Sequence, residues 1–167
     1  PAGEPQRFGE RFGDVHIPAL ADAVDALKTT PGVTLFPELK ADTLPRHDRP
    51  AAISRLMNAC GEVLERTVVI SFEEEILRFA RSHGAPRVGW VVSELGQAAE
   101  ERARVLQPDF LFVDRAAVMP GRLWDGPWRW AVYEINDARE ARRLADQGVW
   151  GVETASVQDL AAALAAG

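Results

Sequence analysis

The sequence predicts an α/β fold, a (β/α)8 TIM barrel, of which these 167 residues cover about strands three to eight. Apolar runs that suit buried strands alternate with helical stretches roughly every 20 to 25 residues, which predicts parallel strands joined by right-handed crossovers. No Gly-rich phosphate-binding loop follows a strand, which disfavours the open doubly wound sheet that the alternation would also allow. A whole barrel takes roughly 250 residues and eight strands.

The elements follow one another in a regular order. The first is a helix at 17–32, in which Leu20, Val24 and Leu27 share one face and a Pro-Gly pair ends the helix. The expected strands are 33–40, 67–72, 86–93, 109–118, 128–136 and 149–155. The other expected helices are 49–65, 73–84, 94–107, 137–148 and 156–167. Residues 1–16, rich in Pro, Gly and charge, are expected to form a loop ahead of the barrel repeats at 17–167, and the whole to form a single domain.

Composition narrows the possible partners. The net charge of −6 argues against a nucleic-acid binder, because such domains usually carry a positive surface. No apolar run is long enough to predict a transmembrane helix. The only cysteine, Cys60, has no partner for an internal disulfide, which favours a cytoplasmic location. The sequence carries no indication of an oligomeric state.

Four stretches carry a resemblance to a known family. They are "IPALADAVDAL", "VTLFPELK", "VVISF" and "VYEINDAREARRLADQGVWGVETASV". In order and spacing they resemble the glycerophosphodiester phosphodiesterase family of (β/α)8-barrel hydrolases. Its members carry an Ile-Pro-Thr-Leu helix start, a strand ending in Glu-Leu-Lys, a Ser-Phe strand end, a Trp-Thr-Val-Asn strand and a Gly-Ile-x-Thr-Asp end. The match runs from Ile17 onward and is least clear between residues 86 and 127.

The resemblance implies a reaction and three site residues. It implies metal-dependent hydrolysis of a small-molecule glycerophosphodiester to glycerol 3-phosphate and an alcohol, with Mg²⁺ or Ca²⁺ as the metal. Glu38 matches a metal-binding carboxylate, Lys40 lies on the same side of its strand and would contact phosphate, and Tyr133 would line the substrate pocket. Residues alone allow a simpler interpretation, in which Glu38 and Lys40 form only an ion pair at the barrel rim.

Departures from the family pattern keep an alternative open. Tyr133-Glu134-Ile135-Asn136 replaces Trp-Thr-Val-Asn, and Thr154-Ala155 replaces Thr-Asp. The His-Arg-Gly and Glu-x-Asp motifs are absent, so no catalytic residue is assigned within 1–167 and the catalytic histidines are expected upstream. His47-Asp48 imitates a family His-Asp pair but follows the Glu-Leu-Lys strand instead of preceding it. The alternative function is a non-catalytic barrel that binds phosphate.

Other residues near strand ends have two interpretations each. Ser71 could line the site, but the acidic residues after it favour an N-cap of the next helix. Asp114 could be a site carboxylate, but a rim salt bridge with Arg115 or another neighbour is favoured. Trp124, Trp128 and Trp130 could form an apolar wall of the pocket or cover one end of the barrel.

Overall fold

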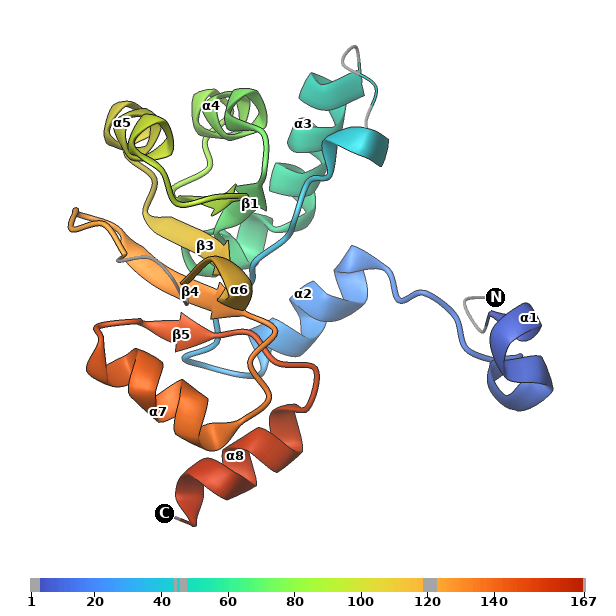
Figure 1. The fold of residues 1–167 in the computed structure, drawn as a ribbon. Coiled ribbons are helices and arrows are strands. Elements are labelled where there is room, and N and C mark those ends of the chain that lie inside the picture. Colours follow the sequence, from blue (N-terminus) through green and yellow to red (C-terminus); the bar gives the residue numbers. More distant parts are fainter. Residues whose placement is uncertain (1–3, 44, 46–47, 119–122, 167) are drawn as a thin grey trace.

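The computed structural model describes residues 4–43, 45, 48–118 and 123–166, and its centre is a five-stranded parallel sheet (Figure 1). The strands are β1 (Val69–Ser71), β2 (Val88–Val92), β3 (Phe110–Asp114), β4 (Arg129–Tyr133) and β5 (Gly151–Val152). Each strand pairs in parallel with the next one along the chain. The strand order never reverses, as it would at the switch point of a doubly wound sheet, so the predicted barrel-type α/β fold is confirmed.

Helices follow the strands, as expected from the alternation. The α-helices are α1 (Pro5–Phe8), α2 (Leu20–Lys28), α3 (Arg49–Ala59), α4 (Glu74–Ser82), α5 (Gln97–Leu106), α6 (Arg115–Val118), α7 (Ala138–Asp146) and α8 (Val157–Ala165). The 3₁₀ helices are η1 (Gly9–Phe12), η2 (Ala41–Thr43) and η4 (Gly61–Arg66). Figure 1 shows α3, α4 and α5 above the strands and α7 and α8 below β5. No helix within the described ranges is long and apolar enough to cross a lipid bilayer.

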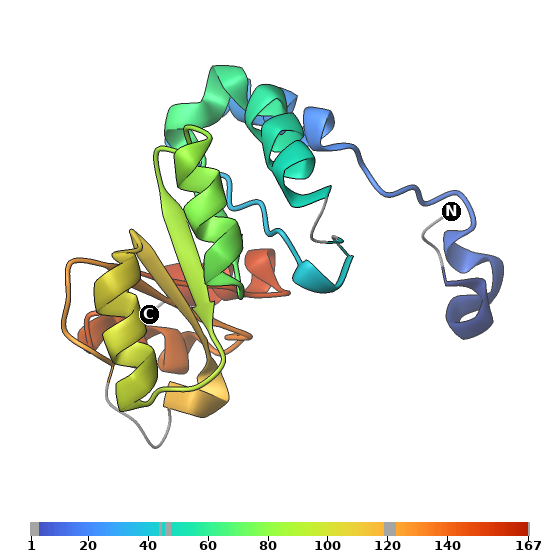
Figure 2. The same cartoon turned by 90° about the horizontal axis from the view of Figure 1, so that it is seen from above.

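The stretch 1–16, expected to be a loop, contains helical turns. Residues 5–12 form the short helical turns α1 and η1, in which the rings of Phe8 and Phe12 meet edge to face with centroids 5.4 Å apart. This contact between neighbouring turns is local and needs no support from the barrel repeats. Figures 1 and 2 both show α1 standing apart from the sheet, at the end of an extended connection to α2.

The strand expected at 33–40 is also corrected. Only two isolated parallel bridges join this extended segment to the β1 side, Leu35 with Thr67 and Glu38 with Ile70. Pro37 lies between them and has no N–H group to donate, so the ladder of hydrogen bonds is broken in the middle. The segment still runs alongside β1, and its carboxyl end reaches the same edge of the sheet as the strand ends.

The two faces of the sheet bury different side chains. One face packs under the helices, where Leu111 and Val113 of β3 are fully buried. The other face gathers aromatic side chains, with the Phe36 ring 5.3 Å from Phe110 and 5.6 Å from Phe112 between centroids. Gly89 makes this possible, because a Cβ atom there would lie 2.8 Å from the Phe112 ring.

The tryptophans before and within β4 belong to the helix-side core. The indole nitrogens of Trp128 and Trp130 both donate to the carbonyl oxygen of Trp124, at 3.3 and 3.0 Å. Trp128 and Trp130 are buried, and the rings of Trp124 and Trp130 meet edge to face. Of their two interpretations, the structure therefore favours the covering role over a wall of the substrate pocket.

The packing of β3 leads to a stability prediction. Leu111→Ala should lower the free energy of unfolding by about 2–5 kcal/mol, because the truncated side chain leaves a cavity between sheet and helices. Val105→Ala on α5, whose side chain is 78% exposed, is the control and should change the free energy of unfolding by less than about 0.5 kcal/mol. Equilibrium urea unfolding measures both. Equal losses in the two variants would contradict the assignment of Leu111 to the core.

Candidate functional site

The carboxyl ends of the parallel strands meet at a cavity of about 170 Å³. Parallel strands place these ends at one edge of the sheet, where barrel enzymes carry their sites. The side chains that line the cavity come from residues 38–40 and from β1 to β5 or the residues that directly follow these strands. They are Glu38, Lys40, Ile70, Phe72, Val91, Phe112, Tyr133 and Glu153. All three site residues predicted from the sequence, Glu38, Lys40 and Tyr133, are thus brought together.

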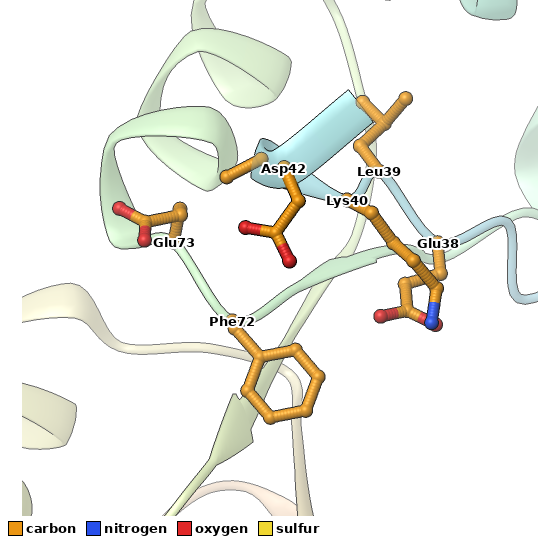
Figure 3. A pocket seen from close by; sticks show the side chains of 7 residues that line it. Glu38, Leu39, Lys40, Asp42, Phe72 and Glu73 are labelled. Atoms are coloured by element: carbon orange, nitrogen blue, oxygen red, sulfur yellow. The ribbon is translucent and has the colours of Figure 1, made fainter. Parts of the chain in front are cut away.

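A second hollow of about 280 Å³ adjoins the first on the side of η2 and the α4 start. Figure 3 shows Glu38 and Lys40 side by side at one end of it, with the Phe72 ring below and Asp42 near the centre. Phe72 lines both hollows and its side chain is exposed. The two spaces share Glu38, Lys40 and Phe72, which makes these side chains the boundary between them.

Of the two carboxylate oxygens of Glu38, one has a partner among the described residues and the other has no hydrogen bond there. Its Oε2 atom lies 3.5 Å from the Nζ atom of Lys40, and its side chain is 27% exposed. Its Oε1 atom is buried and has no hydrogen-bond partner among the residues that the structure describes. A buried carboxylate oxygen without a donor or a cation is unfavourable, because it has lost its water. The geometry therefore suits a ligand or a cation next to Oε1.

Lys40 forms the ion pair that the simpler interpretation of the sequence expects. The Lys40 side chain is 63% exposed, and exposed pairs of this kind contribute at most about 1 kcal/mol to stability. Breaking such a pair costs little free energy, so the Lys40 ammonium can turn towards an anion in the cavity. Ion pairing and anion binding by Lys40 are therefore compatible.

Tyr133 ends β4 and faces the same cavity. Burial raises the pKa of its phenol, and so do the carboxylates of Asp114, Glu134 and Glu153, with a smaller effect from Glu38. The phenol is therefore neutral at physiological pH and can donate a hydrogen bond to an oxygen of a ligand. The residue after it leaves the strand in the left-handed region, since Glu134 has φ 65°.

Glu153 is a cavity residue that the sequence analysis did not single out. It follows β5 directly, its N–H donates to Val132 and its carbonyl accepts from Ile135, which fixes its backbone beside the end of β4. A signal was present, because a carboxylate just after an apolar strand is the feature that singled out Glu38.

Ser71 differs from its favoured interpretation, and Asp114 has a backbone partner. Asp114 accepts a hydrogen bond from the N–H of Ala116 at 2.7 Å, and the neighbouring Arg115 lies 3.9 Å from Glu140. Ser71 is not the N-cap of α4, which is Glu73. The Ser71 hydroxyl is fully buried and donates to the carbonyl oxygen of Leu39 at 2.7 Å.

The histidines lie at other positions in the fold. His16 precedes α2 and is exposed, and His83 ends α4 with its ring nitrogen Nδ1 2.8 Å from the Phe79 carbonyl oxygen. His47 lies outside the described residues. Within 4–43, 45, 48–118 and 123–166, no group of three or more His, Cys, Asp or Glu side chains is arranged to hold a metal ion. Glu38 fits one oxygen ligand of a hard divalent cation, because Oε1 lacks a partner in the described residues.

Solved structures share the fold of this chain, and several of them are phosphodiesterases. The chain shares its fold with an Oleispira antarctica phosphodiesterase solved with the product sn-glycerol-3-phosphate (TM-score 0.73, 19% identity, 94% of this chain and 65% of that one). It is also similar to a glycerophosphodiester phosphodiesterase from Parabacteroides distasonis (TM-score 0.71, 18% identity, 89% and 64%). A weaker likeness is to the Bacillus subtilis YkuI protein, whose EAL domain was solved with substrate c-di-GMP and calcium (TM-score 0.56, 17% identity, 92% and 43%).

These likenesses concern the fold. No protein-family model and no curated protein sequence matches the chain. The chain spans less than two thirds of the length of each of the solved structures named above. The relationship to glycerophosphodiester phosphodiesterases, predicted from the order of four motifs, is therefore confirmed at the level of the fold.

The surroundings of Tyr133 lead to a titration prediction. Glu153→Gln should lower the pKa of Tyr133, because it removes one of the negative charges that oppose ionisation of the phenol. Tyr133 is the only tyrosine in the sequence, so the ultraviolet absorbance of tyrosinate reports this residue alone. Glu101→Gln on α5 is the control and should leave the titration unchanged.

The same shift has a consequence for stability. Folding keeps the phenol neutral, so the folded chain binds more protons than the unfolded chain once the pH exceeds the ordinary pKa of tyrosine. The contribution of Tyr133 to the free energy of unfolding should fall from there up to its raised pKa. A Tyr133 that titrates at the same pH in the native and urea-unfolded chain would contradict this environment.

Proposed function

We propose that the protein hydrolyses small-molecule glycerophosphodiesters to glycerol 3-phosphate and an alcohol, with a divalent metal ion, Mg²⁺ or Ca²⁺. The observation that carries the proposal is the meeting of Glu38, Lys40 and Tyr133 in one cavity at the carboxyl ends of the strands. The likeness of the fold to phosphodiesterases, one of them solved with sn-glycerol-3-phosphate, gives further support.

Each of the three residues has a role that its chemistry allows. Glu38 would hold the metal through Oε1, the buried atom that lacks a partner among the described residues. The metal, when bound, would neutralise charge that develops on the phosphoryl oxygens. Lys40 would contact a phosphoryl oxygen as a compact cation, and the neutral phenol of Tyr133 would donate a hydrogen bond that orients the substrate.

The proposal includes no general acid or base from the described residues. The resemblance implies two histidines for these roles, and the residues around the cavity supply binding and orientation instead. The net charge of −6 favours a small anionic substrate held by local charges over a nucleic-acid polymer. With one cysteine in 167 residues, we place the activity in the cytoplasm.

The metal role of Glu38 can be tested by one substitution. In the full-length protein, Glu38→Gln should reduce the release of glycerol 3-phosphate by at least about 100-fold, because the neutral amide is a poor ligand for a hard cation. The metal concentration that gives half-maximal rate should also rise. Glu101→Gln, which removes a carboxylate on the outer helix α5, should leave both quantities unchanged. Unchanged turnover and metal dependence in Glu38→Gln would disprove the assignment.

The phosphate role of Lys40 calls for a binding measurement. Lys40→Met keeps the length of the side chain but removes its charge, and should weaken binding of glycerol 3-phosphate by roughly 10- to 100-fold. Titration calorimetry measures this, and Lys28→Met on α2, outside the cavity, is the matched control. A protein that binds glycerol 3-phosphate but hydrolyses no glycerophosphodiester would instead be the non-catalytic phosphate-binding barrel.

A further inference from the structure

We infer that Ser71 is a positioning residue for the candidate site, because its hydroxyl group holds the 38–40 segment in place. Ser71 lines neither of the hollows described above and would not touch the substrate. It acts on Glu38 and Lys40 through the backbone of Leu39, which lies between them. The inference rests on the proposed function for what the segment does, and on the contacts of Ser71 for how the segment is held.

The ladder between the 35–39 segment and the β1 side shows why a side chain is needed. Its bonds repeat every two residues, from the N–H of Val68 to the carbonyl of Leu35 and from the N–H of Ile70 to the carbonyl of Pro37. The next donor in this series would be the N–H of Phe72, opposite the carbonyl of Leu39. Phe72 lies beyond the end of β1, and the hydroxyl of Ser71 donates to that carbonyl instead, at 2.7 Å.

The segment has few other backbone bonds to the sheet. Pro37 cannot donate, and the N–H of Leu39 donates to Ile70 at 2.9 Å. After Leu39 the chain leaves the sheet and enters η2. Among the hydrogen bonds of the described residues, the Ser71 bond is therefore the last one that joins the segment to the sheet before Lys40. Without it, the peptide between Leu39 and Lys40 could rotate and move the ammonium away from Glu38.

The same hydroxyl also reaches the α4 side of the cavity. It accepts a hydrogen bond from the N–H of Glu73 at 3.2 Å, while the indole of Trp90 donates to the carbonyl of Phe72 at 3.0 Å. Ser71 thus joins the Glu38–Lys40 segment, the end of β1 and the start of α4, and Trp90 fixes the residue between them. Because Ser71 is fully buried, water cannot easily replace its hydroxyl when it is removed.

Thr67 provides a matched control at the other end of β1. It is buried like Ser71, and its hydroxyl donates to a backbone carbonyl, that of Val63, at 3.0 Å. Its bond lies within the turn that includes η4, and Thr67 lines neither hollow. Thr67→Val therefore removes a buried hydroxyl of the same kind without disturbing Leu39.

The first test follows hydrogen exchange of single backbone amides by nuclear magnetic resonance. Ser71→Ala should accelerate exchange of the Leu39 amide roughly tenfold, because its segment opens more often. Ser71→Thr, which keeps a hydroxyl donor, should restore slow exchange, and Thr67→Val should leave the Leu39 amide as in the wild type. Should Ser71→Ala fail to fold, Ser71→Cys takes its place, since a thiol is a weaker donor of similar shape.

The second test measures ligand binding. Ser71→Ala should weaken binding of glycerol 3-phosphate several-fold and raise KM more than it lowers kcat, whereas Thr67→Val should change neither. Unchanged exchange of Leu39 in Ser71→Ala, or equal acceleration in Thr67→Val, would overturn the inference. Because exchange requires no substrate, a protein that hydrolyses no diester would refute only the proposed function.

Discussion

Parallel pairing of the strands is the constraint on which the candidate site depends. It brings the carboxyl ends of successive strands to one edge of the sheet, so residues far apart in sequence, from Glu38 to Glu153, line one cavity. The apolar core beneath the helices keeps these ends at fixed separations. The polar residues at the edge contribute little to that core, so their side chains can take part in binding.

The 35–39 segment is where this constraint is weakest. Pro37 interrupts its ladder, and the remaining bonds lie on either side of that break. Glu38 lies within this segment and forms an ion pair with Lys40, which directly follows it. Side-chain contacts also hold the segment: the Ser71 hydroxyl donates to the Leu39 carbonyl, and the Phe36 ring packs against Phe110 and Phe112.

The charges at this edge of the sheet suit a ligand that brings both a cation, beside Glu38, and an anion, beside Lys40. Glu38 has a buried oxygen without a partner in the described residues, and burial together with the surrounding carboxylates raises the pKa of the Tyr133 phenol. Among the described residues that line the 170 Å³ cavity, Lys40 is the one cation. Under the proposed function, a phosphate group together with a divalent metal ion would meet both requirements.

The sequence alone determined the alternation of elements and the parallel sheet, because periodicity is a local property of the chain. The polarity at a strand end singled out Glu38 and Lys40, and the resemblance to a family motif supplied Tyr133 and the roles of all three residues. It overestimated the strand at 33–40, since Pro37 removes a single donor from an otherwise strand-like pattern. Only the tertiary structure decided that Ser71 binds Leu39 and that Glu153 joins the cavity. Both depend on which strands are neighbours and on their register, and these contacts between distant residues leave no periodic signal in the sequence.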